Sequence, residues 1–263
     1  MKLKNVQIKV DGFYLKGSIY EPEKRFLQHE TPLVILCHGI PRGDTPTTGV
    51  QEDKDEGYPG LARRCCEEGF FVFHFNFRGT GESGGNFDLF GWTRDLQAVL
   101  NYFEENGLHN NFYLWGFSGG AAVSTYVTAN DPRVKALILA ACPLQFNNLF
   151  TLRELGKRVS WYRDIGIIRD PAFPRDPEQW LQNIYRINPS QYIAKIAPRP
   201  LLVMHGSEDE LIPCEQAEQL YELAGNPKEL HIFPGAGHQL RKEPKVIDKG
   251  LQWLKKTREG TGL

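Results

Sequence analysis

The feature that most constrains this chain is a G-x-S-x-G pentapeptide set between a strand pattern and a helix pattern. Residues 116–120 read Gly-Phe-Ser-Gly-Gly. The apolar stretch 111–115 is typical of a buried strand, and the small residues of 121–128 suit a tightly packed helix. A serine at such a junction lies on a sharp turn, where glycine permits close backbone approach and the helix N-terminus favours negative charge. The pattern predicts that Ser118 presents a nucleophilic hydroxyl. An ordinary glycine-rich turn between a strand and a helix would show the same pattern.

The rest of the chain alternates between strands and helices. Continuous apolar runs at 33–37, 70–73 and 201–204 indicate strands buried on both faces, as in a parallel sheet. Before them, the first twenty residues alternate in polarity around Asp11-Gly12, which predicts a hairpin. The clearest helical patterns span residues 59–68, 91–105, 213–223 and 243–256. Together they predict an α/β fold with about eight mostly parallel strands and flanking helices.

Two stretches interrupt this alternation. Residues 41–57 form a polar loop with a charge run at 52–56, which does not match a calcium-loop spacing and is expected to be a solvated, mobile loop at the site entrance. Residues 143–198 are long and aromatic, which favours a small helical lid over a plain connection. We therefore expect a core made of residues 1–142 and 199–263 with residues 143–198 inserted as a lid. Most of the lid aromatics are expected to be structural.

Composition excludes several classes of function. The 263 residues include 31 basic and 32 acidic ones, so no basic face for nucleic acid is expected. The apolar runs are too short to cross a bilayer, and the N-terminus has no apolar signal region. The odd number of cysteines suits reduced thiols in a cytoplasmic protein, and no Cys/His spacing resembles a zinc site. We expect no metal and no cofactor, no membrane or nucleic-acid partner, and a small-molecule substrate; a homodimer is left open.

A nucleophilic serine needs a base to accept its proton and an acid to orient that base. In a doubly wound sheet such groups lie in loops just after the strands. Asp209 follows the strand pattern 201–206, and His238 follows the pattern 229–233 through a Gly-x-Gly loop. The chain order Ser118, Asp209, His238 is the one expected when a nucleophile elbow lies on an α/β sheet.

Other residues compete for these roles. Glu208 and Glu210 are neighbours that could replace Asp209, which is preferred for its position relative to Gly206 and Pro213. The remaining histidines have structural interpretations: His205 and His231 as core residues of strands, His74 in a buried strand, His29 and His109 as solvated residues, and His38 as a residue that shapes a turn.

Acyl transfer also requires donors for an oxyanion. One is expected to be the backbone N–H of Gly119, directly after the nucleophile. The loop after an early strand, at His38-Gly39-Ile40, offers the other, and we predict the N–H of Ile40. Loss of one such donor typically removes about 3 kcal/mol of transition-state stabilisation.

Taken together, these motifs resemble the α/β-hydrolase superfamily along nearly the whole chain. The resemblance rests on His38-Gly39, the segments 77–83 and 116–120, Gly206 to Asp209, and Gly237-His238. Residues 84–87 and the helix ending at Phe103 make the chain similar to bacterial cinnamoyl/feruloyl-esterase-like and serine-aminopeptidase-like hydrolases. The loop 77–83 carries Asn76 before it where members often have Asp, and it is interpreted as structural.

Three functions follow from this resemblance. The first is hydrolysis of carboxylic esters of small or aromatic acyl groups through an acyl-enzyme. The second is a serine peptidase or amidase on the same three residues, favoured if acidic side chains face the pocket. The third is a hydrolase-fold binding protein without catalysis, which the presence of all three triad candidates argues against.

Overall fold

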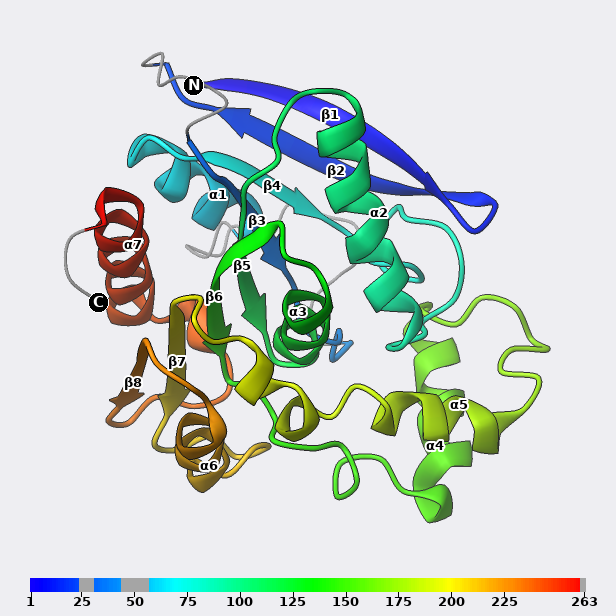
Figure 1. The fold of residues 1–263 in the computed structure, drawn as a ribbon. Coiled ribbons are helices and arrows are strands. Elements are labelled where there is room, and N and C mark those ends of the chain that lie inside the picture. Colours follow the sequence, from blue (N-terminus) through cyan, green and yellow to red (C-terminus); the bar gives the residue numbers. More distant parts are fainter. Residues whose placement is uncertain (24–30, 44–56, 261–263) are drawn as a thin grey trace.

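The computed structural model describes residues 1–23, 31–43 and 57–260, which form one eight-stranded sheet flanked by helices (Figure 1). The spatial order is β1-β2-β4-β3-β5-β6-β7-β8. β1, β2 and β4 pair antiparallel, and all neighbours from β4 to β8 are parallel. The predicted fold class is confirmed. The strands are β1 Lys2–Val10, β2 Phe13–Glu21, β3 Leu33–Cys37, β4 Phe71–Phe75, β5 Phe112–Phe117, β6 Val134–Ala140, β7 Leu201–Gly206 and β8 Lys228–Phe233.

The predicted hairpin is formed by β1 and β2. Val10 pairs with Phe13, so only Asp11 and Gly12 make the turn. Both have positive φ, 44° and 88°, as a type I′ turn requires, and that turn matches the twist of the two strands. The predictions on the charge run 52–56 and on His29 fall outside the described residues.

Helices cover both faces of the sheet. α2 Gly91–Glu105, α3 Gly119–Asn130 and α6 Glu215–Leu223 pack into one apolar cluster, whereas α1 Gly57–Glu67 and α7 Pro244–Glu259 pack into a second cluster on the other face (Figure 1). Because helices cover both faces of the sheet, side chains on both faces of the central strands are buried. This explains why these strands are continuously apolar instead of alternating between apolar and polar residues. Of the described helices, none has the length and apolar character that a membrane-spanning segment needs.

The stretch between β6 and β7 contains α4 Leu152–Asp164, α5 Pro177–Tyr185 and two short 3₁₀ turns, Pro189–Gln191 and Ile193–Lys195. Figure 1 shows α4 and α5 next to each other at one end of the molecule. Asp176 begins α5 by accepting a hydrogen bond from the N–H of Gln179 at 2.9 Å. Buried residues of this segment belong to the same apolar cluster as the sheet and α2, and they include Phe146, Leu155, Tyr162, Trp180 and Ile184.

Polar contacts anchor this segment to the body. The guanidinium of Arg169 donates hydrogen bonds to the carbonyl oxygens of Ser83, Gly79 and Gly81, which lie in the loop after β4. The loop after β4 is itself fixed to α2, because Arg78 forms a buried ion pair with Asp95 at 2.6 Å. This segment is therefore positioned relative to the carboxyl ends of the strands.

Candidate active site

Ser118 lies where β5 ends and α3 begins. Its backbone angles are φ 51° and ψ −120°, a region that residues with a side chain rarely adopt. The turn is tight on both sides. A Cβ at Gly116 would lie 2.5 Å from the Cα of Ala121, and one at Gly120 would lie 2.3 Å from the carbonyl oxygen of His38. Glycine is required at both positions, and the serine side chain stands half-buried at the end of the strand.

The structure brings Ser118, Asp209 and His238 together. The Nε2 of His238 is 3.0 Å from the Oγ of Ser118. The Nδ1 of His238 is 2.8 Å and 3.0 Å from the two carboxylate oxygens of Asp209. A carboxylate can only accept, so Nδ1 carries the proton and Nε2 is free to accept the serine hydroxyl. The three side chains form one hydrogen-bonded chain.

The Asp209 carboxylate is buried and well supplied with donors. Its Oδ1 accepts hydrogen bonds from the backbone N–H groups of Leu211 and Ile212, both at 2.9 Å. Burial alone raises the pKa of Asp209. This effect is outweighed by hydrogen bonds from His205, His238 and Ile212 and by the charge of His238. Together they hold the pKa of Asp209 well below its usual range. The carboxylate therefore stays ionised at neutral pH.

The two predicted oxyanion donors lie beside each other at the elbow. A Cβ on Gly119 would lie 2.8 Å from the side chain of Ile40, and one on Gly39 would lie 3.1 Å from the Cβ of Ser118. Within the described part of the chain, neither the N–H of Ile40 nor that of Gly119 donates to a protein acceptor. Both groups are available to an oxygen atom bound next to Ser118.

His38 orients the peptide between Gly39 and Ile40. Its Nε2 accepts the N–H of Phe77 at 3.1 Å, so the proton lies on Nδ1, which donates to the carbonyl oxygen of Gly39 at 2.8 Å. In a trans peptide the C=O and the N–H point in opposite directions. Turning the Gly39 carbonyl toward His38 thus directs the Ile40 N–H away from it. Burial lowers the pKa of His38 to about 4, which keeps this donor neutral.

An ion pair lies beside the triad. Arg42 donates to Oε1 of Glu210 at 3.2 Å, and the other oxygen of Glu210 accepts the backbone N–H of His238 at 3.4 Å. Arg42 follows the loop of the candidate oxyanion donor Ile40, and Glu210 follows the candidate acid Asp209, so the pair links two loops at the site. The acidic side chain next to the triad is already paired with a cation.

Three histidines differ from their sequence interpretation. His109, expected to be solvated, is buried, because its ring packs against Phe71 at 4.9 Å and Phe103 at 6.2 Å between ring centroids. His231 lies in β8 but is exposed, since β8 is an edge strand. His205 is buried as expected, yet its Nε2 contacts the carboxylate of Asp209 at 3.1 Å. No local sequence pattern indicates this contact, because the end of a buried strand suits a core histidine equally well.

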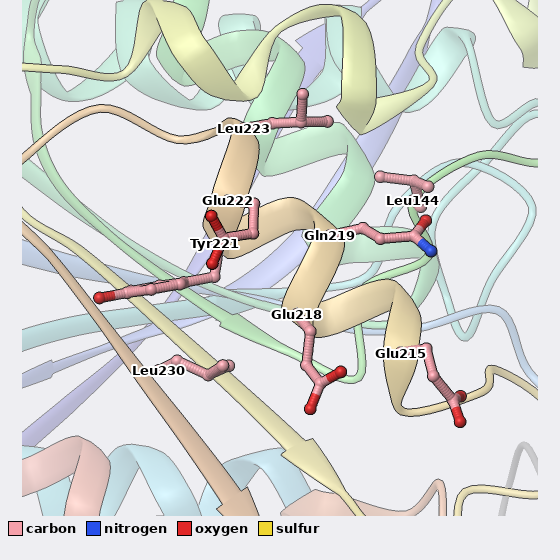
Figure 2. Close-up of a pocket in the computed structure, with 8 residues that line it drawn as sticks. All are labelled: Leu144, Glu215, Glu218, Gln219, Tyr221, Glu222, Leu223 and Leu230. Atoms are coloured by element: carbon pink, nitrogen blue, oxygen red, sulfur yellow. The ribbon is translucent and has the colours of Figure 1, made fainter.

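A cavity of about 890 Å³ lies elsewhere. It runs along the outer side of α6, between Leu144 and Leu230, and none of the triad side chains lines it (Figure 2). Three glutamates of α6, Glu215, Glu218 and Glu222, give it an acidic wall. In the described ranges, no cluster of three or more His, Cys, Asp or Glu side chains is arranged to hold a metal ion.

Solved structures with the same fold include two hydrolases. The α/β hydrolase GrgF from Penicillium sp. sh18 aligns with a TM-score of 0.72 and 22% identity, covering 98% of this chain and 100% of that one. Est1E from Butyrivibrio proteoclasticus, solved with ferulic acid bound, aligns with a TM-score of 0.66 and 20% identity, covering 95% of this chain and 96% of that one. These likenesses establish the α/β-hydrolase fold.

Sequence relatives extend the comparison. The chain is 28% identical over 176 residues to the uncharacterised protein YfhR of Escherichia coli strain K12, which is 65% of this chain and 54% of that protein. It thus spans about half the length of that relative. The prolyl oligopeptidase family, Peptidase_S9, matches residues 62–261, a range that contains Ser118, Asp209 and His238. Because this match covers most of the chain, the protein belongs to the prolyl oligopeptidase family and is an α/β hydrolase.

Proposed function

We propose that this protein is a serine hydrolase that cleaves carboxylic esters of small or aromatic acyl groups through an acyl-enzyme. The observation that carries the proposal is the continuous chain of hydrogen bonds from the Oγ of Ser118 through His238 to Asp209. Acyl transfer to serine needs three groups in this order: a hydroxyl, an imidazole of fixed tautomer and a buried ionised carboxylate.

The reaction follows from these positions. The Oγ of Ser118 attacks the ester carbonyl while Nε2 of His238 takes its proton, and Asp209 stabilises the imidazolium that forms. The N–H groups of Gly119 and Ile40 bind the oxyanion of the tetrahedral intermediate. His238 then protonates the leaving alcohol, which departs from the acyl-enzyme. Water attacks the acyl group by the same path, its proton passes to His238 and then to Ser118, and the acid is released.

The acyl group is proposed to bind under the segment 143–198, acting as a lid. This segment reaches the oxyanion loop: a Cβ on Gly43 would lie 2.6 Å from Ile165 and 3.8 Å from the indole of Trp161. Trp161 is 37% exposed, whereas the neighbouring Tyr162 is buried in the core. An exposed indole beside the oxyanion loop suits an apolar or aromatic acyl chain. Est1E, whose fold is similar, was solved with ferulic acid.

A peptidase is the second candidate, and the match to a peptidase family favours it. An aminopeptidase holds the substrate ammonium with a carboxylate, and the acidic side chain beside the triad is Glu210. Its pKa is lowered by hydrogen bonds from backbone N–H groups and from Arg42. Because Arg42 already pairs with this carboxylate, an ammonium group would have to displace the guanidinium, which supports the ester over the amide.

Matched substrates test the proposal. We expect the purified chain to hydrolyse p-nitrophenyl acetate and butyrate at a higher kcat/KM than aminoacyl p-nitroanilides at the same concentrations. Ser118→Ala should lower turnover by roughly 10⁵-fold or more, and a fluorophosphonate probe should label wild type but not this variant. Ser160→Ala on the exposed face of α4 is the matched serine control and should keep full activity.

The outcomes separate the three functions. Faster cleavage of the anilides than of the esters would replace the esterase by a peptidase. A Ser118 that does not react with the fluorophosphonate would favour a binding protein. A Trp161→Ala variant checks the acyl site, because KM should rise for aromatic acyl esters and stay constant for acetate.

A further inference from the structure

His205 is the penultimate residue of β7, and its side chain has no exposed surface. It touches the proposed acid directly, with Nε2 at 3.1 Å from Oδ2 of Asp209. The same nitrogen is 2.9 Å from the carbonyl oxygen of Ile212. A histidine that only fills a core would not place its ring nitrogen on the carboxylate that orients His238.

The partners of His205 fix its proton. The Ile212 carbonyl can only accept, so Nε2 carries the hydrogen and donates it to that carbonyl, while the same N–H lies 3.1 Å from Asp209. The Nδ1 of His205 is buried and has no hydrogen-bond partner in the part of the chain that the structure describes. A second proton there would be a buried donor without an acceptor, which is unfavourable. His205 is therefore a neutral donor.

Oδ2 of Asp209 consequently lies between two imidazoles. His238 donates to it through Nδ1 at 2.8 Å, and the Nε2–H of His205, which is hydrogen-bonded to the Ile212 carbonyl, makes a polar contact with it at 3.1 Å and helps to lower the pKa of Asp209. Oδ1 is held by backbone N–H groups of the same loop. The second imidazole has two effects: it fixes the rotation of the carboxylate, and it draws off part of the negative charge that would otherwise act on His238.

We propose that His205 is a positioning residue that acts through Asp209 on His238, holding the carboxylate in place and limiting how strongly it stabilises the His238 imidazolium. The proposal deepens the proposed function and rests on it for its kinetic readout. Other charged groups near the carboxylate are Glu208 and Glu210 on its own loop, with Arg42 paired to Glu210. Cys214 before α6 also lies near it, with a pKa that burial and the nearby carboxylates raise. None of these donates a hydrogen bond to Asp209 among the described residues.

Two variants separate the donor from the ring. His205→Phe keeps an aromatic ring and removes the donor, whereas His205→Gln places an amide N–H near the position of Nε2. We expect His205→Phe to lower kcat roughly 10-fold or more with little change in KM, since a hydrogen bond to a charged group is worth about one to two orders of magnitude. The acid limb of its kcat/KM profile should move to higher pH, because Asp209 then keeps the negative charge that it shares with His205 in wild type. His205→Gln should restore both.

The control is a buried histidine in a loop far from the site. His109 precedes β5, at the end of that strand opposite to Ser118, and packs on Phe71. His109→Phe should leave kcat and the acid limb unchanged. Equal kinetic changes in His109→Phe and His205→Phe would overturn the proposal, as would His205→Gln behaving like His205→Phe.

A measurement without substrate keeps the proposal testable on its own. The ring ¹⁵N signals of wild-type protein should identify His205 as the Nε2–H tautomer with a bare Nδ1. The ¹H signal of the His238 Nδ1–H, which Asp209 accepts, should move in His205→Phe. An Nδ1–H tautomer of His205, or an unchanged His238 Nδ1–H signal in the variant, would refute the role of His205. If esters are not hydrolysed while these signals behave as expected, the proposed function fails and the coupling between His205 and His238 stands.

Discussion

The backbone of Ser118 is held in a conformation that is unfavourable for any residue with a side chain. At φ 51° and ψ −120° the serine Cβ crowds the main chain, and such conformations cost on the order of 1–3 kcal/mol each. The surrounding close contacts of Gly116 and Gly120 leave the turn no alternative. The strain directs the hydroxyl to where His238 can reach it, at the expense of stability.

This strain can be measured by comparing two variants that both lack the hydroxyl. Ser118→Gly relieves it, although glycine loses about 0.5–1 kcal/mol through the greater freedom of the unfolded chain. We expect Ser118→Gly to have a free energy of unfolding ~1 kcal/mol above that of Ser118→Ala in urea denaturation. An alanine variant more stable than the glycine variant by about 0.5–1 kcal/mol would show that the turn is not strained.

Individual site residues differed in how well the sequence indicated them. Ser118, Asp209 and His238 all follow strand patterns at the sheet edge where functional loops gather, so position along the chain was enough to select them. The contact of His205 with Asp209 was missed. The end of a buried strand suits both a core histidine and a histidine that contacts the site, and only the direction of the side chain distinguishes these two cases. His109 was misinterpreted because burial of a turn depends on distant strands.

At the scale of elements, the fit between α7 and the sheet is tight. Gly250 faces the indole of the fully buried Trp115, and a Cβ there would lie 2.2 Å from the ring. Alanine normally stabilises a helix interior by about 0.5–1 kcal/mol over glycine. At Gly250 a rigid ring occupies the space that the methyl group would need. Overpacking therefore decides whether alanine raises or lowers the free energy of unfolding.

A pair of glycines tests this. Gly250→Ala should lower the free energy of unfolding by ~1–2 kcal/mol, the clash outweighing the gain in helix propensity. A Cβ added at Gly156 of α4 would meet no other atom within 4 Å, so Gly156→Ala should raise the free energy of unfolding by ~0.5–1 kcal/mol. Urea denaturation of both checks the result, and a stabilised Gly250→Ala would contradict the packing of α7.

The elements themselves were largely predictable. The hairpin followed from Asp11-Gly12, and α2 has the bounds that its apolar spacing indicated. The order of the strands was not predictable, because placing β4 between β2 and β3 depends on pairing between segments distant in sequence. The anchoring of the insertion through Arg169 also depends on such contacts, which leave no local pattern.

At the scale of the whole molecule, buried histidines make stability depend on pH. Burial lowers the pKa of His38 and of His74 to about 4, from an ordinary value near 6.5. Between these values the unfolded chain binds more protons than the folded one. The contribution of each neutral histidine to the free energy of unfolding is therefore complete above about pH 6.5, and it is lost as the pH falls to about 4.

We expect the free energy of unfolding to fall by ~3 kcal/mol for each of these two histidines over this range. His74→Phe, in β4 beside Tyr20, removes one titrating group, so its unfolding free energy should decline less between pH 6.5 and pH 4 than that of wild type. Urea denaturation at several pH values in that window measures the slope. Equal slopes in the two proteins would contradict the lowered pKa of His74.

The order of the strands along the chain also determines when the site is completed during synthesis of the protein. Ser118 emerges from the ribosome well before Asp209 and His238, which follow the late strands β7 and β8 at one end of the sheet. A nascent or truncated chain would hold the Ser118 hydroxyl without His238 and Asp209. The proposed ester cleavage would begin only when the last strand docks, so the appearance of activity would report completed folding.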